Sequence, residues 1–299
     1  MTAGTTALQR DGRLARVLQG IDLPVALATA AAFVFLFAKP MALLGRDWWT
    51  NPDAGHGLLL APVALWLAWR AGVRPDAVRN FRLGVPVLLV AVLVRYMSGL
   101  AAELFTMRMS MLMAMAGLTI CYFGVRQLRS WWLSVILLVL SVPLPEVVLG
   151  AIALPLQFTA SKMGASLLAW RHVPVLLTGN VIQIPGHQLF VAEACSGLRS
   201  LTALLSLAVL LGGITLRSPL ARVALVALAI PVAVVVNGVR VFLTGFLVYF
   251  VSPEMGQGFM HTTEGWLLFL VAFALLGALA TLAALVERAL PWGREVAHA

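Results

Sequence analysis

The chain has 299 residues, of which 61% are hydrophobic and only 11% charged, and its mean hydropathy is +0.96. A soluble domain of this length could not bury so many apolar side chains, so the soluble class is excluded. The net charge of +9 comes from 21 Lys and Arg against 12 Asp and Glu. No basic stretch shows the aromatic interleaving of single-strand binders, so we expect the basic residues in cytoplasmic loops and no nucleic-acid partner.

Apolar runs long enough to cross a ~30 Å hydrocarbon core, about 20 residues each, recur along the chain. They predict about eight transmembrane helices in an all-α polytopic membrane protein, at roughly 22–44, 55–72, 83–102, 107–125, 130–149, 196–215, 222–251 and 264–286. The first run is too long for a cleavable signal peptide. No internal repeat, low-complexity segment or linker divides the sequence, which predicts a single domain over 1–299.

The region 150–195 differs from the spans around it. We expect an amphipathic segment first, followed by short strands over 173–194, because Thr-Gly-Asn and Pro-Gly-His are turn signals between the β-branched runs of "PVLLTGNVIQIPGHQLFVAEAC". This pattern predicts a short extracytoplasmic β-hairpin on the bilayer surface before the sixth span. An extended peptide could pair with an exposed edge of such strands.

The basic residues predict the orientation of the chain. With both termini in the cytoplasm, thirteen Lys and Arg fall in cytoplasmic segments, five fall in outer segments, and three lie within apolar runs. Lys and Arg are retained on the cytoplasmic side of short loops, so this orientation is the expected one. It places the hairpin and Cys195 on the extracytoplasmic side.

The sequence "VAEACSGLRS" places Cys195 between the predicted strands and the sixth span. Its only possible intrachain partner, Cys121, is predicted near the cytoplasmic end of the fourth span, far beyond the ~7 Å Cα separation of a disulfide. A cysteine here could be a small buried apolar residue. However, "CSG", with Ser196, opens a helix, and a helix N-terminus lowers the pKa of a thiol, which favours a nucleophile.

Two further polar groups are predicted at the same outer level of the membrane. Arg240 lies within the seventh span and Asn237 shares its helix face, while His261 opens the eighth span with Glu264 one turn later. Arg240 could instead pair with a buried carboxylate or snorkel, and His261 could be an ordinary interface residue. Together with Cys195, they supply a nucleophile, a base oriented by a carboxylate, and a cation for an oxyanion, a sufficient set for acyl transfer.

Other polar residues have minor predicted roles. Arg199 could keep the thiolate ionised or snorkel outward, and Glu193 is expected to face water. His56 and His187 are expected at the membrane interface, where either could line a substrate entrance. There is no His-Glu-x-x-His motif and no other persuasive ligand set, so no metal or cofactor is expected.

The motifs "CSGLRS", "NGVRV" and "HTTEGW" as a set resemble the exosortase/archaeosortase family, and the likeness extends to "SVPLPEVVLGAIALPLQFTASKMGASLLAW" and "TGNVIQIPGHQLFVAEACSG". The resemblance implies a sortase-like cysteine peptidase or transpeptidase of the bacterial inner membrane. Its partners would be membrane lipids and exported proteins with a C-terminal sorting tail, which has a Pro-Glu-Pro-like motif, one transmembrane helix and a basic end. It further implies Cys195 as nucleophile, His261 as proton-transfer residue and Arg240 as transition-state stabiliser, with transfer to an unidentified acceptor or to water.

Two alternatives remain at this stage. The first is a transporter that binds an anion at Arg240 and Asn237, although the internal repeat common in transporters is absent from the sequence. The second is a membrane subunit without catalytic activity.

Overall fold

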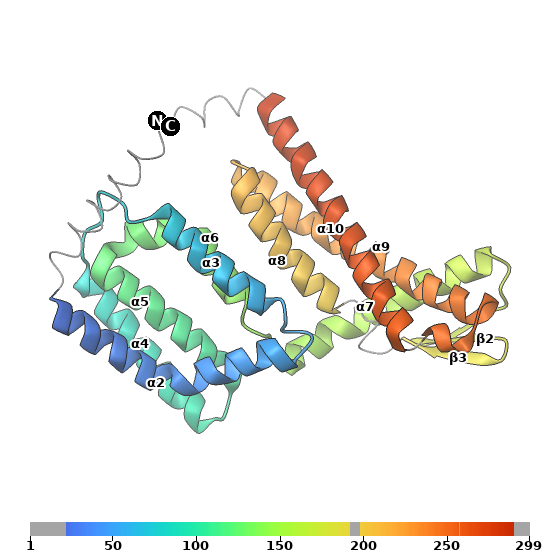
Figure 1. Cartoon of the computed structure of the whole chain (residues 1–299), viewed down its shortest axis with the longest axis horizontal. Helices are drawn as coiled ribbons and strands as arrows, with labels where there is room; N and C mark the ends of the chain where they lie inside the picture. The colour runs from blue at the N-terminus through green and yellow to red at the C-terminus, as the bar shows by residue number, and fades with distance from the viewer. Residues whose placement is uncertain (1–21, 192–197, 257, 290–299) are drawn as a thin grey trace. The chain divides into compact units, whose positions relative to one another are not determined.

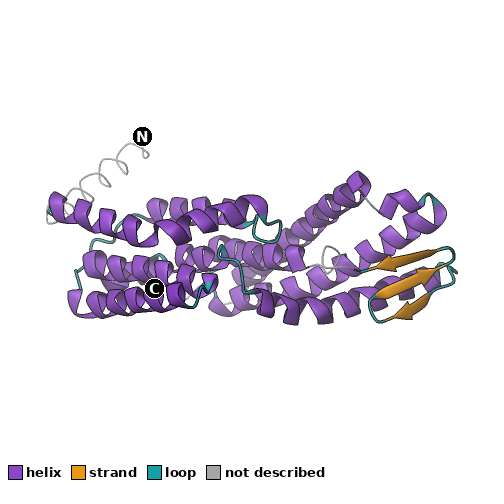
Figure 2. Cartoon of the chain, turned by 90° about the horizontal axis from the view of Figure 1, so that it is seen from below, coloured by secondary structure: helices purple, strands orange, loops and turns teal. Residues whose placement is uncertain are grey.

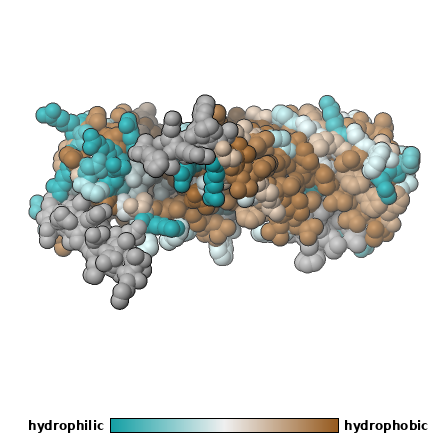
Figure 3. All heavy atoms as spheres, turned by 90° about the horizontal axis from the view of Figure 1, so that it is seen from above, coloured by the Kyte–Doolittle hydropathy of each residue, from teal (hydrophilic) through white to brown (hydrophobic). Residues whose placement is uncertain are grey.

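The computed structural model describes residues 22–191, 198–256 and 258–289 (Figure 1). Within these ranges the chain forms nine α-helices, labelled α2 to α10, and one three-stranded sheet. The chain divides into two compact units, Met1–Pro143 and Leu144–Ala299. Hydrophobic side chains cover much of the face shown in Figure 3, as expected of a membrane protein.

The first unit is entirely helical in its described part. Its helices are α2 (Leu23–Thr50), α3 (Gly57–Ala71), α4 (Phe81–Leu100), α5 (Leu104–Ser130) and α6 (Trp132–Leu140). Helices α4 and α5 are joined by a short turn and pack closely, because glycines face side chains of the partner helix. Gly84 lies against Cys121, and a Cβ at Gly117 would be 2.9 Å from Leu88 Cγ.

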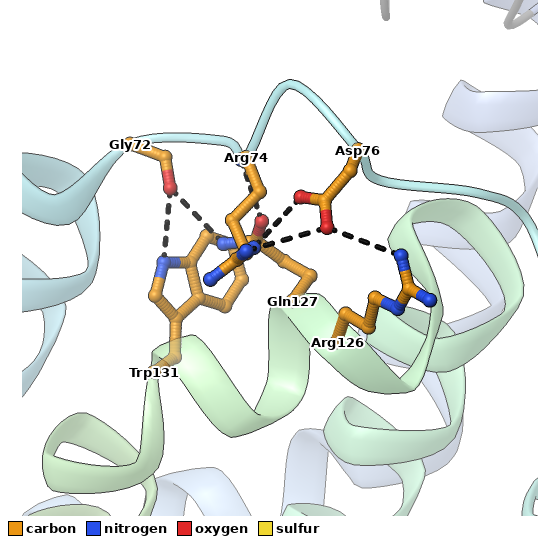
Figure 4. Close-up of polar contacts among 6 residues, drawn as sticks. All are labelled: Gly72, Arg74, Asp76, Arg126, Gln127 and Trp131. Atoms are coloured by element: carbon orange, nitrogen blue, oxygen red, sulfur yellow. Dashed lines mark hydrogen bonds and ion pairs between the residues drawn. The ribbon is translucent and has the colours of Figure 1, made fainter. Parts of the chain in front are cut away.

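Hydrogen bonds from the end of α2 and from the residues that flank α3 reach the two ends of α6. Near the start of α3, Trp48 Nε1 donates to Ser141 O at 2.8 Å, and His56 Nε2 lies 3.2 Å from Leu140 O. At the other end, Trp131 Nε1 donates to Gly72 O at 3.2 Å (Figure 4). These bonds satisfy terminal carbonyl groups that apolar surroundings would otherwise leave unpaired.

The loop after α3 is fixed by a buried amide from α5. The side chain of Gln127, 0% exposed, donates from Nε2 to Gly72 O at 3.0 Å and accepts from Arg74 N at 2.8 Å (Figure 4). Outside the membrane helices, Asp76 accepts from Arg74 Nε at 2.8 Å and from Arg126 Nη1 at 3.3 Å. The hydrogen bond from Arg74 lowers the pKa of the Asp76 carboxyl.

The second unit combines four helices with the sheet. Its elements are α7 (Glu146–Trp170), β1 (Leu176–Thr178), β2 (Val181–Ile184), β3 (His187–Phe190), α8 (Leu198–Thr215), α9 (Pro219–Phe250), a 3-10 helix (Pro253–Gly256) and α10 (Gly258–Ala289). One hydrophobic cluster joins α8, α9 and α10 around Leu204, Ala229 and Leu276. A second cluster joins α7, the sheet and the later part of α9 around Leu168, Ile182 and Val241.

Glycines allow α7 and α9 to approach each other closely. A Cβ at Gly164 of α7 would be 2.5 Å from Val241 Cγ1, and a Cβ at Gly238 of α9 would be 2.9 Å from Met163 Cβ. In lipid, where the tails are as apolar as the side chains, such small-residue contacts and their van der Waals packing hold helices together. The α7–α9 contact is therefore the main interface of this part of the unit.

The sheet is an antiparallel meander in the order β1-β2-β3 (Figure 2). Its two turns are Gly179–Asn180 and Pro185–Gly186, and both glycines have positive φ angles, 65° and 77°, that other residues rarely adopt. The register aligns Leu177, Ile182 and Leu189 on one face of the sheet, and all three pack in the second hydrophobic cluster. Leu189 reaches α9, where its Cδ1 would lie 3.1 Å from a Cβ at Gly245.

The structure confirms several of the predicted elements and corrects others. Short strands within 173–194 are confirmed, although they form three strands rather than one hairpin. The predicted span at 130–149 is wrong, because α6 ends at Leu140 and a second helix, α7, begins at Glu146. Pro143 and Pro145 lie between the two, where each lacks a helical N–H donor and disfavours helix in the residue before it, so the closely spaced pair interrupts the helix.

The described ranges contain fewer long apolar helices than the eight predicted spans. Six helices of the described ranges are long and apolar enough to cross a membrane: Leu23–Thr50, Phe81–Leu100, Leu104–Ser130, Glu146–Trp170, Pro219–Phe250 and Gly265–Ala289. Two apolar stretches are shorter, Gly57–Ala71 and Ser200–Thr215. Helix α7 occupies residues that we expected to form an amphipathic surface segment. Its 25 residues extend about 38 Å at 1.5 Å per residue.

Two glycines of α7 provide a test of the α7–α9 interface. Gly164→Ala should lower the stability of the protein by about 1–3 kcal/mol, because the added Cβ overlaps Val241 and the helices must separate. Gly150→Ala is the control, since a Cβ at Gly150 would meet nothing within 4 Å. Thermal unfolding in detergent measures both variants. Equal midpoints for the two would contradict the close packing of α7 on α9.

Candidate functional site

The predicted site residues are distributed over three helices and one segment without a described structure. Cys195, Ser196 and Glu193 lie outside the described residues, between β3 and α8. Arg199 belongs to the first turn of α8, and His261 and Glu264 belong to the first two turns of α10. Asn237 and Arg240 lie in α9. All of these elements belong to the second unit.

Arg240 is packed between α9 and the start of α10. Its guanidinium lies directly against Gly265, where a Cβ would be 3.0 Å from Nη2 and 3.2 Å from Cζ. Position 261 precedes Gly265 by four residues, so helix geometry places it one turn earlier on the same face of α10. The arginine and the histidine position therefore share one side of this helix.

Asn237 lies one turn before Arg240 on the same face of α9. It is only 6% exposed, which is low for a side chain with two donors and an acceptor. Arg240 itself is half-buried. In hydrocarbon such groups are costly, and polar residues in this situation commonly mark functional sites.

The fold brings both ends of the segment that contains Cys195 to α9. At the β3 end, Val191 belongs to the same hydrophobic cluster as Val241. At the α8 end, Leu201 belongs to the same cluster as Ala233. Arg240 lies between Ala233 and Val241 in the sequence of α9, so the two ends belong to clusters that include α9 residues on either side of the arginine.

A turn residue of the sheet holds the backbone immediately before this segment. Asn180 O accepts from Val191 N at 3.0 Å, and Asn180 Nδ2 donates to Val191 O at 3.2 Å. The same amide nitrogen lies 3.3 Å from Oε1 of Gln157 on α7. Gln157 is 7% exposed, so Asn180 links a buried helix amide to the chain four residues before Cys195.

The two other histidines considered from the sequence lie elsewhere. His56 belongs to the first unit, where its ring contacts Leu140 O at the end of α6. His187 begins β3, and its Nδ1 lies 3.4 Å from Pro185 O within the same turn. Neither contact brings these rings to Arg240.

The described residues include a buried ion pair but no candidate metal site. Arg108 and Asp47 form an ion pair in the first unit, with Nη2 and Oδ2 2.7 Å apart. Across the described part of the chain, no three His, Cys, Asp or Glu form a group that could hold a metal ion. Cys121, buried in α5, forms no disulfide with any described residue.

These features define a multi-pass membrane protein with a polar cluster buried among its last helices. The sequence also matches a known family model, described as Transmembrane exosortase (Exosortase_EpsH), over residues 48–278. This match covers more than half of the chain and extends through both units, so the chain belongs to the exosortase family, as the sequence motifs indicated. No curated protein and no solved structure matches the chain significantly.

Sequence reasoning missed three residues that shape the site. The sequence has 25 glycines and gives no reason to single out Gly265. The structure gives one, because the Arg240 guanidinium occupies the space that a side chain at this position would need. Asn180 was interpreted as a turn residue, and Gln157 was assigned to a surface segment. An isolated amide within the apolar α7 sequence was the available signal, because such groups need partners in lipid.

The Asn180–Gln157 contact can be tested by a double-mutant cycle. Asn180→Ala leaves the buried Gln157 amide without this donor, and should cost about 1–3 kcal/mol. Gln157→Leu should also destabilise the protein, but the double variant should cost less than the sum of the single changes. Unfolding in detergent measures all three variants. Strict additivity would show that the two amides are not coupled.

Proposed function

We propose that this protein is a membrane cysteine transpeptidase or peptidase that cleaves the C-terminal sorting tails of exported proteins outside the cytoplasmic membrane, through a thioester on Cys195. Membership of the exosortase family supports this class of reaction. The observation that carries the residue assignment is the packing of the Arg240 guanidinium on Gly265, on the face of α10 that includes position 261. The two ends of the Cys195 segment belong to hydrophobic clusters that also include residues of α9.

The proposed reaction has two acyl-transfer steps. His261 accepts the thiol proton as Cys195 Sγ attacks the scissile carbonyl, and the C–N bond then breaks as the leaving amine takes that proton. Arg240 stabilises the oxyanion or anchors a carboxylate of the substrate motif, with Asn237 orienting the guanidinium. An amine, a hydroxyl group or water then attacks the thioester, the C–S bond breaks, and Cys195 is released. Glu264 fixes the histidine tautomer, and Arg199 and Ser196 support the thiolate.

The proposed topology places this chemistry on the extracytoplasmic side, with both termini in the cytoplasm. In this topology the shorter helix α3 also crosses the membrane, and α7 takes the place of the incorrect span at 130–149, so that five crossings precede the sheet. The substrate's own transmembrane helix would pack laterally against the enzyme, with its basic end in the cytoplasm.

The Cys195→Ala variant distinguishes binding of the substrate from its cleavage. This variant lacks the only sulfur that could carry the acyl group but keeps the apolar helix surfaces, so it should co-purify with a tail-bearing reporter and leave it uncleaved. Immunoblots of membranes follow the full-length reporter, and hydroxylamine should trap the thioester of the parent enzyme. Alkylation of Cys195 by an impermeant reagent should also abolish processing, whereas a transporter would continue to transport. Complete processing by Cys195→Ala would eliminate the nucleophile assignment.

A pair of glycines in α10 tests the placement of Arg240. Gly265→Ala should lower kcat about 10-fold or more with little change in KM, because the new Cβ displaces the guanidinium. Gly277→Ala, in the same helix, meets nothing within 4 Å and should process normally. Arg240→Lys, which keeps the charge but loses the planar fork, should show the same kcat defect. The assignment of Arg240 would fail if both Gly265→Ala and Arg240→Lys matched the parent enzyme.

A further inference from the structure

The strand β3 forms an edge of the sheet that can pair with an additional chain. Among the described elements, β3 pairs only with β2, and it forms one border of the three-stranded order β1-β2-β3. One face of this strand is held against α9, because Leu189 packs there beside Gly245. An open edge presents unpaired N–H and C=O groups, which near a membrane must bind water or another backbone.

The register identifies which backbone groups point to the open edge. Val191 N donates to Asn180 O, so these opposite residues form a hydrogen-bonded pair. Hydrogen-bonded and non-hydrogen-bonded pairs alternate along an antiparallel ladder, so Leu189 and His187 also point their polar backbone groups toward β2. The N–H and C=O groups of Gln188 and Phe190 therefore point away from β2, to the open edge.

The opposite edge of the sheet, on β1, has fewer outward-pointing backbone groups for pairing with a peptide. By the same alternation, β2 uses Val181 and Gln183 to bond β1, so Thr178 and Leu176 are occupied and only Leu177 of β1 points outward. The edge of β3 thus presents two residues for pairing, whereas the edge of β1 presents one. In addition, Cys195 follows Phe190 by five residues in the sequence, so the two are at most about 17 Å apart.

We infer that the outer edge of β3 binds the extended segment of the substrate that contains the scissile bond, through main-chain hydrogen bonds to Gln188 and Phe190. This inference rests on the proposed function. The pairing holds a peptide without demanding a particular side chain at each position, and the exposed side chain of Phe190, 64% accessible, adds an apolar contact beside it. The strand direction then leads the bound peptide toward the nucleophile.

A proline substitution tests the contribution of the Gln188 N–H group, which points to the open edge. Gln188→Pro removes that donor, and proline is tolerated where an edge N–H faces solvent, while Gln188→Ala removes the side chain and keeps the N–H. With a reporter ending in a Pro-Glu-Pro motif, one transmembrane helix and a basic cluster, Gln188→Pro should raise KM about 3- to 10-fold over Gln188→Ala. kcat and the unfolding midpoint should be similar in the two variants. Equal KM values would overturn the inference, provided that cleavage depends on Cys195.

Crosslinking gives a second measurement that does not depend on the proline variant. In the Cys195→Ala background, a photoreactive phenylalanine analogue at Phe190 should capture the reporter. The same analogue at Leu176, which is 61% exposed and lies on β1, is the matched control and should not capture it. Capture from Leu176 alone would place the peptide at the wrong edge. Complete cleavage of the reporter by Cys195→Ala would instead refute the proposed function itself.

Discussion

The close approach of α7 and α9 is the contact on which the second unit depends. Gly164 and Gly238 remove the side chains that would hold the helix axes apart, and Gly245 leaves room for Leu168 of α7 and Leu189 of β3. The sheet packs in the same cluster as both helices, so its position follows from theirs. Because lipid provides no hydrophobic drive for helices to associate, this packing has to be tight to hold the sheet against α9.

Each unit uses one buried glutamine to hold the backbone of a neighbouring connection. In the first unit, Gln127 bonds Gly72 O and Arg74 N. In the second, Gln157 contacts Asn180, which in turn bonds both backbone groups of Val191. A neutral amide has both donor and acceptor groups and has a smaller desolvation cost than an ion, so it can anchor irregular backbone within an apolar helix bundle. The second anchor fixes the chain that leads to Cys195.

The proposed chemistry combines a rigid frame with groups delivered from several elements. Arg240 is held in the contact between α9 and α10, while the sheet and α8 deliver the two ends of the cysteine segment to the same helix. Such an arrangement suits a reaction on a membrane-tethered tail. The substrate helix would lie in lipid, and the β3 edge would hold the extended portion in register with the nucleophile.

The sequence by itself determined the class of protein and its family, because hydropathy and the three motifs are local patterns that need no tertiary information. It also determined the strands before Cys195, since Gly179 and Gly186 mark turns with positive φ. Tertiary structure decided the remaining features. The hydropathy of 130–149 runs through Pro143 and Pro145 without a break, so it does not show that α6 ends at Leu140 and that α7 begins at Glu146. Contacts such as Gly265 with Arg240, or Asn180 with Gln157, join residues more than 20 positions apart, and periodicity within one element carries no information about them.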